Sequence, residues 1–202
     1  MNVKILNPSK YREMPWANGR GVTTELCVRQ DVQTGRMLWR LSIAGVDTDG
    51  LFSHFPGYDR VLVLLEGAGL TLSHGDGTVD RLSCAFQLAA FPGDATTQAA
   101  LVNGPIRDFN VITDRESFSA TVAVIDAARS ERIAIDADHL AIFAVDKELQ
   151  VGSPDPARHI VPKRNLLLAD SPTSGDWVLS GATAIVVQLH TIPQCSGPGD
   201  RL

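Results

Sequence analysis

The sequence predicts an all-β protein, and three observations support that fold class. Apolar residues recur with a period of two, and clusters of Gly, Pro, Asp and Asn separate these stretches. Helical periodicity is weak before residue 115. The clearest alternation lies in residues 38–44, where one strand face carries Trp39, Leu41 and Ile43 and the other carries Arg40, Ser42 and Ala44.

The predicted strands follow one another with turn residues between them. The first set comprises residues 38–44, 60–65, 70–73, 86–91 and 109–113, and the second comprises residues 120–125, 140–145, 165–168, 177–179 and 184–190. Residues 74–77, His-Gly-Asp-Gly, predict a hairpin turn, because glycine tolerates the positive φ that tight hairpins require. Residues 11–21 contain Pro, Gly and Asn and are expected to form a loop.

The two sets of strands predict two antiparallel β-modules packed together. We assign residues 1–118 to a first module with an N-terminal loop, residues 119–193 to a second and smaller module, and residues 194–202 to a flexible tail. The charged stretch 126–138 is a candidate junction between them. One elongated barrel is the alternative, since no sequence repeat links the two halves.

Charge and composition exclude a class of partner. The chain has 202 residues, 44% hydrophobic and 20% charged, which is ordinary for a globular protein large enough to bury a core. Its formal net charge is −5, and its 18 basic residues form no cluster. Because nucleic-acid surfaces show a basic patch or stripe, we expect no nucleic-acid partner.

Neither a membrane nor an oxidising compartment is indicated. The longest apolar run, residues 61–72, is interrupted by a Glu-Gly pair and is too short to span a bilayer. Residues 1–8 lack the apolar core of an export signal. Three cysteines, Cys27, Cys84 and Cys195, have no metal-type spacing, so free thiols and a cytoplasmic location are predicted.

Residues 52–67 resemble the first motif of the cupin proteins, which are metal-binding β-barrels. In that motif a metal-binding Glu begins a strand that closes in Glu-Gly, and counting back seven residues from Gly67 places Arg60 at the Glu position. The two motif histidines fall at His54 and Pro56. One of three metal ligands therefore remains, and a cation replaces the carboxylate.

The second cupin motif, Pro-x-Gly followed closely by a ligand His, is also degraded. Residues 91–97 supply Pro92, but Gly93 comes early and threonines occupy the neighbourhood of the histidine. A transition metal needs three or four converging N, O or S ligands, and an arginine would repel the ion. The sequence therefore predicts a cupin-type β-barrel, bicupin in organisation, with no metal and no other cofactor.

An arginine inside such a barrel needs a partner of opposite charge. The guanidinium of Arg60 stays protonated and presents a planar fork of donors that matches carboxylate or phosphate. One interpretation is a clamp for a ligand carboxylate. The other is an internal ion pair, for which the candidate partners are Asp59, Glu66 and Asp108.

Five blocks of the sequence resemble the HutD family. They are residues 14–26 (MPWANGRGVTTEL), 39–44 (WRLSIA), 49–53 (DGLFS), 55–60 (FPGYDR) and 104–111 (GPIRDFNV). The blocks occur in the family's order and cover roughly the first 115 residues, which makes the resemblance specific. Arg20 is a departure, because the family often has a small residue between the two signature glycines.

The resemblance implies a bicupin fold and an association with bacterial histidine utilisation, whose intermediates include urocanate, formiminoglutamate and formylglutamate. It also implies a protein that senses such an intermediate, with no established catalytic activity. Each of these acids carries a carboxylate, which suits an arginine clamp. The predicted function is therefore the binding of a small anionic metabolite by a metal-free cupin that senses or modulates histidine utilisation.

Nine residues are predicted to bind this ligand: Arg60, Asn18, Trp16, Gly19, Thr24, Arg40, Ser42, His54 and Asn110. Alternatives stay open for several of them. Asn18-Gly19 is also typical of a tight turn, Trp16 of a wall or core residue, and Arg40 of a solvated strand face.

Strand alternation limits two further assignments. Thr23 and Thr24 are neighbours, so only one of them can face inward. Asp108 shares a strand face with Asn110, and we expect it to form an ion pair that holds Arg60 or Arg40.

A metal-independent enzyme acting on a related acid, an isomerase or a hydrolase, is the alternative function. His54 with Glu25, Asp59 or Tyr58 would supply the base and acid that such chemistry needs. No nucleophile–base spacing is distinctive, so we assign no catalytic residue. A third hypothesis is an interaction protein whose barrel surface contacts a regulator of histidine utilisation, such as a repressor, or a pathway enzyme. Separately, exposed sheet edges favour a homodimer.

Overall fold

The computed structural model describes residues 2–16, 19, 21–155 and 157–193. In that part of the chain the regular elements are the strands β1 to β19 and one short 3-10 helix, η1 (Pro8–Lys10), so the all-β prediction is confirmed. The strands form four sheets. The predicted tail, residues 194–202, and Asn18 lie outside the described residues. No helix among the described residues is long and apolar enough to cross a membrane.

The first module is a six-stranded sheet, in the order β2-β3-β4-β11-β6-β9, that faces a four-stranded sheet in the order β5-β10-β7-β8. Its strands are β2 (Arg12–Pro15), β3 (Gly21–Gln30), β4 (Met37–Val46), β5 (Gly50–Leu51), β6 (Tyr58–Glu66), β7 (Leu70–His74), β8 (Val79–Leu82), β9 (Leu88–Pro92), β10 (Thr97–Leu101) and β11 (Ile106–Asp114). The predicted hairpin turn joins β7 to β8, where the Gly77 N–H donates to the His74 carbonyl at 2.9 Å.

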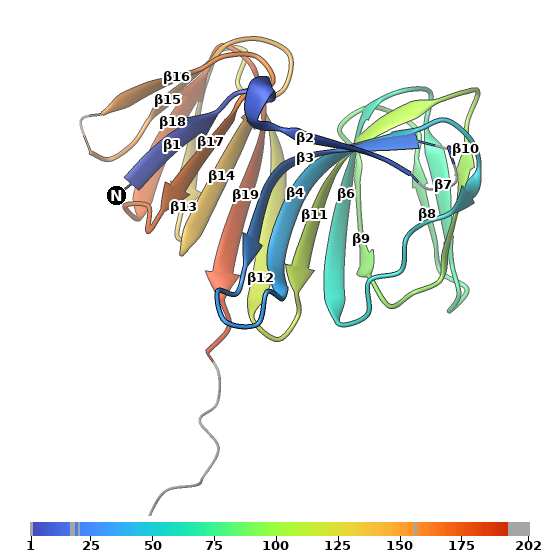
Figure 1. The fold of residues 1–202 in the computed structure, drawn as a ribbon. Coiled ribbons are helices and arrows are strands. Elements are labelled where there is room, and N and C mark those ends of the chain that lie inside the picture. Colours follow the sequence, from blue (N-terminus) through green and yellow to red (C-terminus); the bar gives the residue numbers. More distant parts are fainter. Residues whose placement is uncertain (1, 17–18, 20, 156, 194–202) are drawn as a thin grey trace, which may run out of the picture.

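The second module repeats this arrangement with a five-stranded sheet, β1-β17-β14-β19-β12, and a four-stranded sheet, β13-β18-β15-β16. Its strands are β1 (Asn2–Leu6), β12 (Phe118–Asp126), β13 (Ser130–Ile135), β14 (His139–Ala144), β15 (Leu149–Gly152), β16 (Arg158–Val161), β17 (Leu166–Asp170), β18 (Gly175–Ser180) and β19 (Thr183–Thr191). Figure 1 shows this module on the left and the first module on the right.

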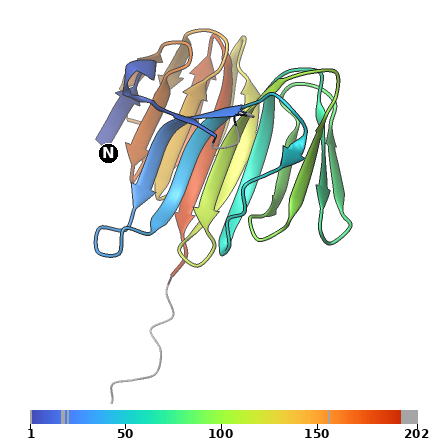
Figure 2. The ribbon, with the colours of Figure 1, turned by 45° about the vertical axis from the view of Figure 1, so that its right-hand side comes forward.

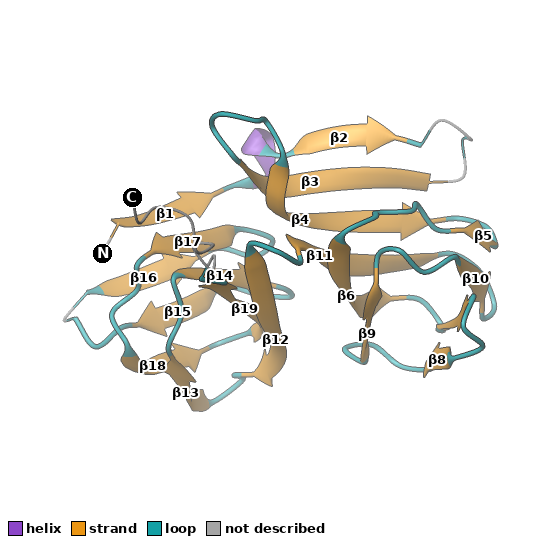
Figure 3. Ribbon diagram, turned by 90° about the horizontal axis from the view of Figure 1, so that it is seen from below, coloured by secondary structure: helices purple, strands orange, loops and turns teal. Residues whose placement is uncertain are grey.

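The four sheets are arranged in one stack (Figures 2 and 3). Three clusters of buried apolar side chains lie between them. Leu62 and Leu72 belong to the cluster inside the first module, and Trp177 to the cluster inside the second. The third cluster lies between the two larger sheets, where the rings of Phe109 and Phe143 meet with centroids 5.5 Å apart. Both faces of each larger sheet are thus covered, which explains the continuous apolar runs of residues 61–65 in β6 and 140–144 in β14.

Each module consists of two facing sheets that are not closed into a barrel, in the manner of a double-sheet jelly roll. The predicted barrel is therefore present as an open sandwich. Two such modules, rather than one elongated barrel, make up the fold.

Two details of the predicted organisation are wrong. The assignment of residues 1–118 to the first module fails at its start, because β1 pairs with β17, Asn2 opposite Asp170, and completes the second module. The predicted junction at residues 126–138 contains the edge strand β13, which pairs with β18. An edge strand is exposed to water on one face and along its unpaired edge. Charged residues are therefore tolerated in β13, and they obscure the two-residue alternation that identifies a strand.

Candidate functional site

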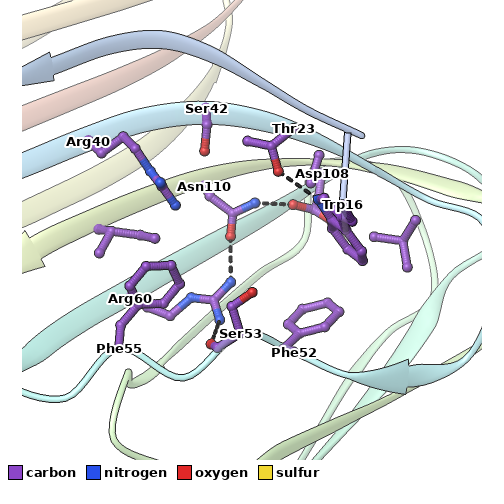
Figure 4. Close-up of a pocket in the computed structure, with 13 residues that line it drawn as sticks. Trp16, Thr23, Arg40, Ser42, Phe52, Ser53, Phe55, Arg60, Asp108 and Asn110 are labelled. Atoms are coloured by element: carbon purple, nitrogen blue, oxygen red, sulfur yellow. Dashed lines mark hydrogen bonds between the residues drawn. The ribbon is translucent and has the colours of Figure 1, made fainter. Parts of the chain in front are cut away.

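A pocket lies inside the first module, between the six-stranded sheet and the loop that precedes β6 (Figure 4). It holds about 410 Å³ of empty space, its mouth included. Polar side chains share its wall with aromatic rings, and the lining residues are Trp16, Thr23, Arg40, Ser42, Ala44, Val46, Phe52, Ser53, Phe55, Arg60, Asp108, Asn110 and Ile112. Five of the nine predicted ligand-binding residues are in this lining: Trp16, Arg40, Ser42, Arg60 and Asn110.

Alternation along β4 and β11 puts polar residues in the pocket and apolar ones in the core. Arg40 and Ser42 line the pocket, whereas Leu41 is fully buried between the larger sheets, so the predicted strand faces are confirmed. On β11, Asp108 and Asn110 line the pocket. The register places Asn110 opposite Ser42, so these polar side chains form a patch in the middle of the sheet.

Arg60 is buried in the pocket wall with 7% of its surface exposed. Its Nη1 donates to the Ser53 carbonyl at 3.2 Å, and its Nη2 donates to Asn110 Oδ1 at 3.0 Å. Burial lowers the pKa of Arg60 to about 10, so the side chain stays charged at neutral pH. The guanidinium carbon lies 5.0 to 5.5 Å from three ring centroids, those of Phe52, Phe55 and Phe91.

Two of the three predicted internal partners of Arg60 are paired elsewhere. Asp59 pairs with Arg115, with Oδ1 and Nε 2.7 Å apart, and Glu66 pairs with Arg164. Within the described part of the chain, Arg60 forms no salt bridge, and its Nε has no hydrogen-bond partner. The guanidinium therefore keeps donor capacity that the described residues do not use.

The third candidate, Asp108, reaches Arg60 only through Asn110. The Asn110 amide accepts from Arg60 through Oδ1 and donates through Nδ2 to Asp108 Oδ1, so one amide separates the two groups. Burial raises the pKa of Asp108 to about 7, although Arg60 opposes the shift. The expectation of a direct ion pair with Arg60 or Arg40 is wrong, because Arg60 lies opposite Ile112, two inward-facing positions away.

Arg40 adds a second guanidinium to the same wall. It lies opposite Ile112, which lies opposite Arg60, so the two arginines flank β11 at one level of the sheet. Their Cα atoms are about 10 Å apart, twice the spacing between strands. Arg40 Nε is buried without a hydrogen-bond partner among the described residues, and the guanidinium carbon lies 5.2 Å from the Phe55 ring centroid. Burial lowers the pKa of Arg40, and the nearby charge of Glu25 opposes this shift. Arg40 is part of the pocket lining, so it does not lie on a solvated outer face of the strand.

Trp16 forms part of the wall at the turn between β2 and β3. Its Nε1 donates to Thr23 Oγ1 at 2.8 Å. Gly21 permits this position, because a Cβ there would lie 3.1 Å from the Trp16 ring and 2.3 Å from the Gly45 carbonyl oxygen. Gly19 has a φ of +67° and donates to the Trp16 carbonyl at 3.0 Å, so it shapes the turn and does not line the pocket.

Two more of the predicted side chains lie outside the pocket. Thr24 is opposite Ile43, which faces the core between the larger sheets, and Thr23 is the threonine that lines the pocket. His54 is exposed, and its Nε2 lies 2.8 Å from the Asp94 carbonyl oxygen, so the acid–base set predicted around it is not in the lining. Among the described residues no group of three or more His, Cys, Asp or Glu side chains is arranged to hold a metal ion.

The aromatic loop before β6 is the part of the site that the sequence reasoning missed. Phe52, Ser53 and Phe55 line the pocket, and the Phe55 N–H donates to the Gly93 carbonyl at 2.8 Å. A Cβ at Gly93 would lie 2.5 Å from the Phe55 carbonyl oxygen, so glycine is required for this approach. Two phenylalanines just ahead of an inward-facing arginine are a usable signal for cation–π contacts.

Comparison with known proteins assigns this fold and pocket to a family. The HutD family model matches residues 8–187, which span both modules and every pocket-lining residue. The chain belongs to the HutD family. The bicupin organisation implied by the HutD resemblance thus agrees with the two sandwiches of the structure.

Relatives of the chain extend this assignment. A Pseudomonas putida protein described as an uncharacterized 21.2 kDa protein in the hutC 3′ region is 33% identical over 149 residues, which are 74% of this chain and 77% of the relative. Protein Ves from Escherichia fergusonii is 39% identical over 119 residues, which are 57% of this chain and 61% of that protein.

Solved structures agree with the sequence comparison. HutD from Pseudomonas fluorescens SBW25 has a TM-score of 0.82 at 29% identity, covering 95% of this chain and 100% of that one. A conserved protein from Pseudomonas aeruginosa PAO1 has a TM-score of 0.86 at 30% identity, covering 94% and 100%. Protein Ylba from E. coli, at 10% identity and a TM-score of 0.64, shares the cupin-like fold alone and covers 93% of this chain and 90% of its own.

Proposed function

We propose that this HutD-family chain binds a small carboxylate metabolite of histidine degradation and acts as a sensor of histidine utilisation. The candidate ligands are urocanate, formiminoglutamate and formylglutamate. The observation that carries the proposal is Arg60, a buried guanidinium in a pocket wall that forms no salt bridge with the described residues. Membership of the HutD family supports the choice of pathway.

The charge of the pocket favours an anion. Burial of a guanidinium is unfavourable unless its donors are bonded, and Arg60 and Arg40 each keep a buried Nε without a partner among the described residues. Asp108, with a pKa of about 7, offsets only part of their charge at neutral pH. A ligand carboxylate would accept charge-assisted hydrogen bonds from the guanidinium groups and make their burial favourable.

The shape of the pocket suits a small acid with a flat or aliphatic body. Phe52, Phe55 and Trp16 supply apolar wall, while Ser42 and Asn110 supply hydrogen-bonding groups. A wall that combines apolar surface with placed polar groups is typical of sites that orient one ligand.

Calorimetric titration with the three acids tests the proposal. Arg60→Lys keeps a positive charge but loses the planar fork, so we expect affinity to fall at least about tenfold, or about 1.4 kcal/mol. Arg132→Ala removes an exposed arginine of β13 and is the matched control, which should bind as the unmodified chain does. Binding that Arg60→Lys leaves unchanged contradicts the clamp, and no saturable binding of any of the three acids contradicts the function.

A sensor must also pass its ligand state to another molecule. We propose that the recipient is a regulator of histidine utilisation or a second copy of the chain. Size-exclusion chromatography and pull-downs with purified regulator, each with and without the bound acid, measure this step. A ligand that changes neither the apparent mass nor the capture of the regulator contradicts the sensor role and leaves the binding role standing.

A further inference from the structure

Asp108 is a buried group of the pocket that the carboxylate clamp does not use. It is 1% exposed and lies on β11 between Ala44 and Leu64 of the neighbouring strands, both apolar. Its Oδ1 accepts from Asn110 Nδ2, but its buried Oδ2 accepts from no donor in the described part of the chain. An acceptor of this kind is available to a donor that enters the pocket.

The fold alone does not account for an aspartate at this position. Leaving a buried carboxyl oxygen unpartnered is unfavourable, and the amide of an asparagine would hold Asn110 without burying an ionisable group. The charge of Arg60 on β6 favours ionisation of Asp108, but Arg60 Nη2 donates its hydrogen bond to Asn110 and not to Asp108. An unpartnered polar atom in the wall of a pocket is instead typical of a ligand contact.

We propose that Asp108 accepts a hydrogen bond from an N–H group of the ligand, so that the pocket selects acids carrying both a carboxylate and an N–H donor. The inference rests on the carboxylate binding proposed at Arg60 and specifies its ligand class. Arg60 and Asp108 contact opposite ends of the Asn110 amide, so a ligand lying along that amide meets donors at one end and an acceptor at the other. Figure 4 shows this row of polar groups.

The chemistry of the free oxygen separates this class from simple dicarboxylates. An ionised Asp108 repels a second carboxylate at short range, whereas an N–H donor forms a charge-assisted hydrogen bond with it. Acids with an imidazole ring and amino acids with an N-acyl group belong to the selected class. Their isosteres without N–H do not.

Two pairs of probes isolate the N–H group at pH 8, where Asp108 is largely ionised. Urocanate is compared with 3-(2-furyl)acrylate, whose ring has an oxygen and no N–H, and N-formylglutamate is compared with its analogue in which a methylene group replaces the N–H. Each acid is titrated calorimetrically into the unmodified chain, Asp108→Asn and the control Asp126→Asn, which changes an exposed carboxylate at the end of β12. A cooperative thermal unfolding transition of Asp108→Asn shows that this variant folds.

We expect the unmodified chain to bind the N–H member of a pair at least about tenfold more tightly, as for a hydrogen bond to a charged group. Asp108→Asn should weaken the N–H acids by a similar factor, because it presents a donor where the ligand needs an acceptor. It should not weaken the other two acids, for which loss of the carboxylate charge only relieves repulsion. Asp126→Asn should leave all four affinities unchanged.

Equal affinity within both pairs for the unmodified chain overturns the inference while the clamp at Arg60 stands, and this comparison needs no variant. An equal effect of Asp108→Asn on both kinds of acid overturns it in the same way. Failure of all four acids to bind overturns the inference together with the proposed function.

Discussion

The two modules of this chain share one architecture but have different interiors. In the second module, fully buried apolar side chains fill the space between the sheets, among them Ile142, Leu149 and Trp177. In the first module the apolar cluster gives way, over part of the larger sheet, to a pocket whose wall holds Arg60 and Asp108. The same sandwich therefore has a packed apolar interior in one copy and encloses a polar pocket in the other.

The buried polar atoms of the pocket contrast with the buried tryptophan of the second module. Trp177 Nε1 in the second module donates to the Thr173 carbonyl at 3.0 Å. Arg60 Nε and Asp108 Oδ2 in the first module have no partner among the described residues. Natural sequences violate the rules of stable packing mainly where function requires it, and the first module does so at the pocket.

Truncation of the packed interior should produce the largest effect. Trp177→Ala leaves a cavity at a fully buried position and should lower the free energy of unfolding by about 3–5 kcal/mol. Ser42→Ala in the pocket wall should change it by less than about 1 kcal/mol, because no packed side chain is lost. Urea unfolding at 25 °C measures both variants, and similar losses would contradict the contrast between the modules.

Removal of the buried carboxylate should stabilise the first module in a pH-dependent way. The folded pKa of Asp108, about 7, lies above the ordinary value of 3.8 for an aspartate, so its favourable contribution to stability is complete below about pH 4 and is lost as the pH rises through 7. Asp108→Asn should therefore gain about 2 kcal/mol relative to the unmodified chain between pH 5 and pH 8.

Unfolding curves at pH 5 and pH 8 check this prediction, with Asp126→Asn as the control for an exposed carboxylate. The other carboxylates contribute equally to the pH dependence of both chains, so their contributions cancel in the stability difference. The same stability difference at both pH values would show that Asp108 titrates normally and would remove the electrostatic distinction between the two modules.

We expect the smallest change in stability from substitutions of two neighbouring threonines, Thr23 and Thr24. Thr23→Val removes the oxygen that accepts from Trp16 Nε1, so we expect a loss of about 1 kcal/mol in stability and a severalfold loss in ligand affinity. Thr24→Val, on the opposite strand face, is the matched control and should stay within about 0.5 kcal/mol. The reverse order of effects would place Thr24 in the pocket.

Local alternation accounts for what the sequence could predict about the site. The faces of β4 follow from the order of its residues, so Arg40 and Ser42 are placed correctly without knowledge of any partner strand. The inward position of Arg60 follows from its spacing to Gly67 in a degraded motif. Both inferences depend on neighbours within one strand, where geometry repeats every second residue.

Long-range pairing accounts for what the sequence could not predict. The choice between Thr23 and Thr24 depends on the register of β3 against β4, in which a bulge follows Glu25. The position of Phe55 depends on its hydrogen bond to Gly93, and β1 finds β17 at the far end of the chain. Such pairings are decided by tertiary packing and leave little mark on the local sequence.

A crystal structure of the chain with one of the three acids tests the central claim most directly. We predict that a carboxylate oxygen of the ligand lies within about 3 Å of a guanidinium nitrogen of Arg60. A ligand bound away from Arg60, or a metal ion bound in the pocket, would contradict the account.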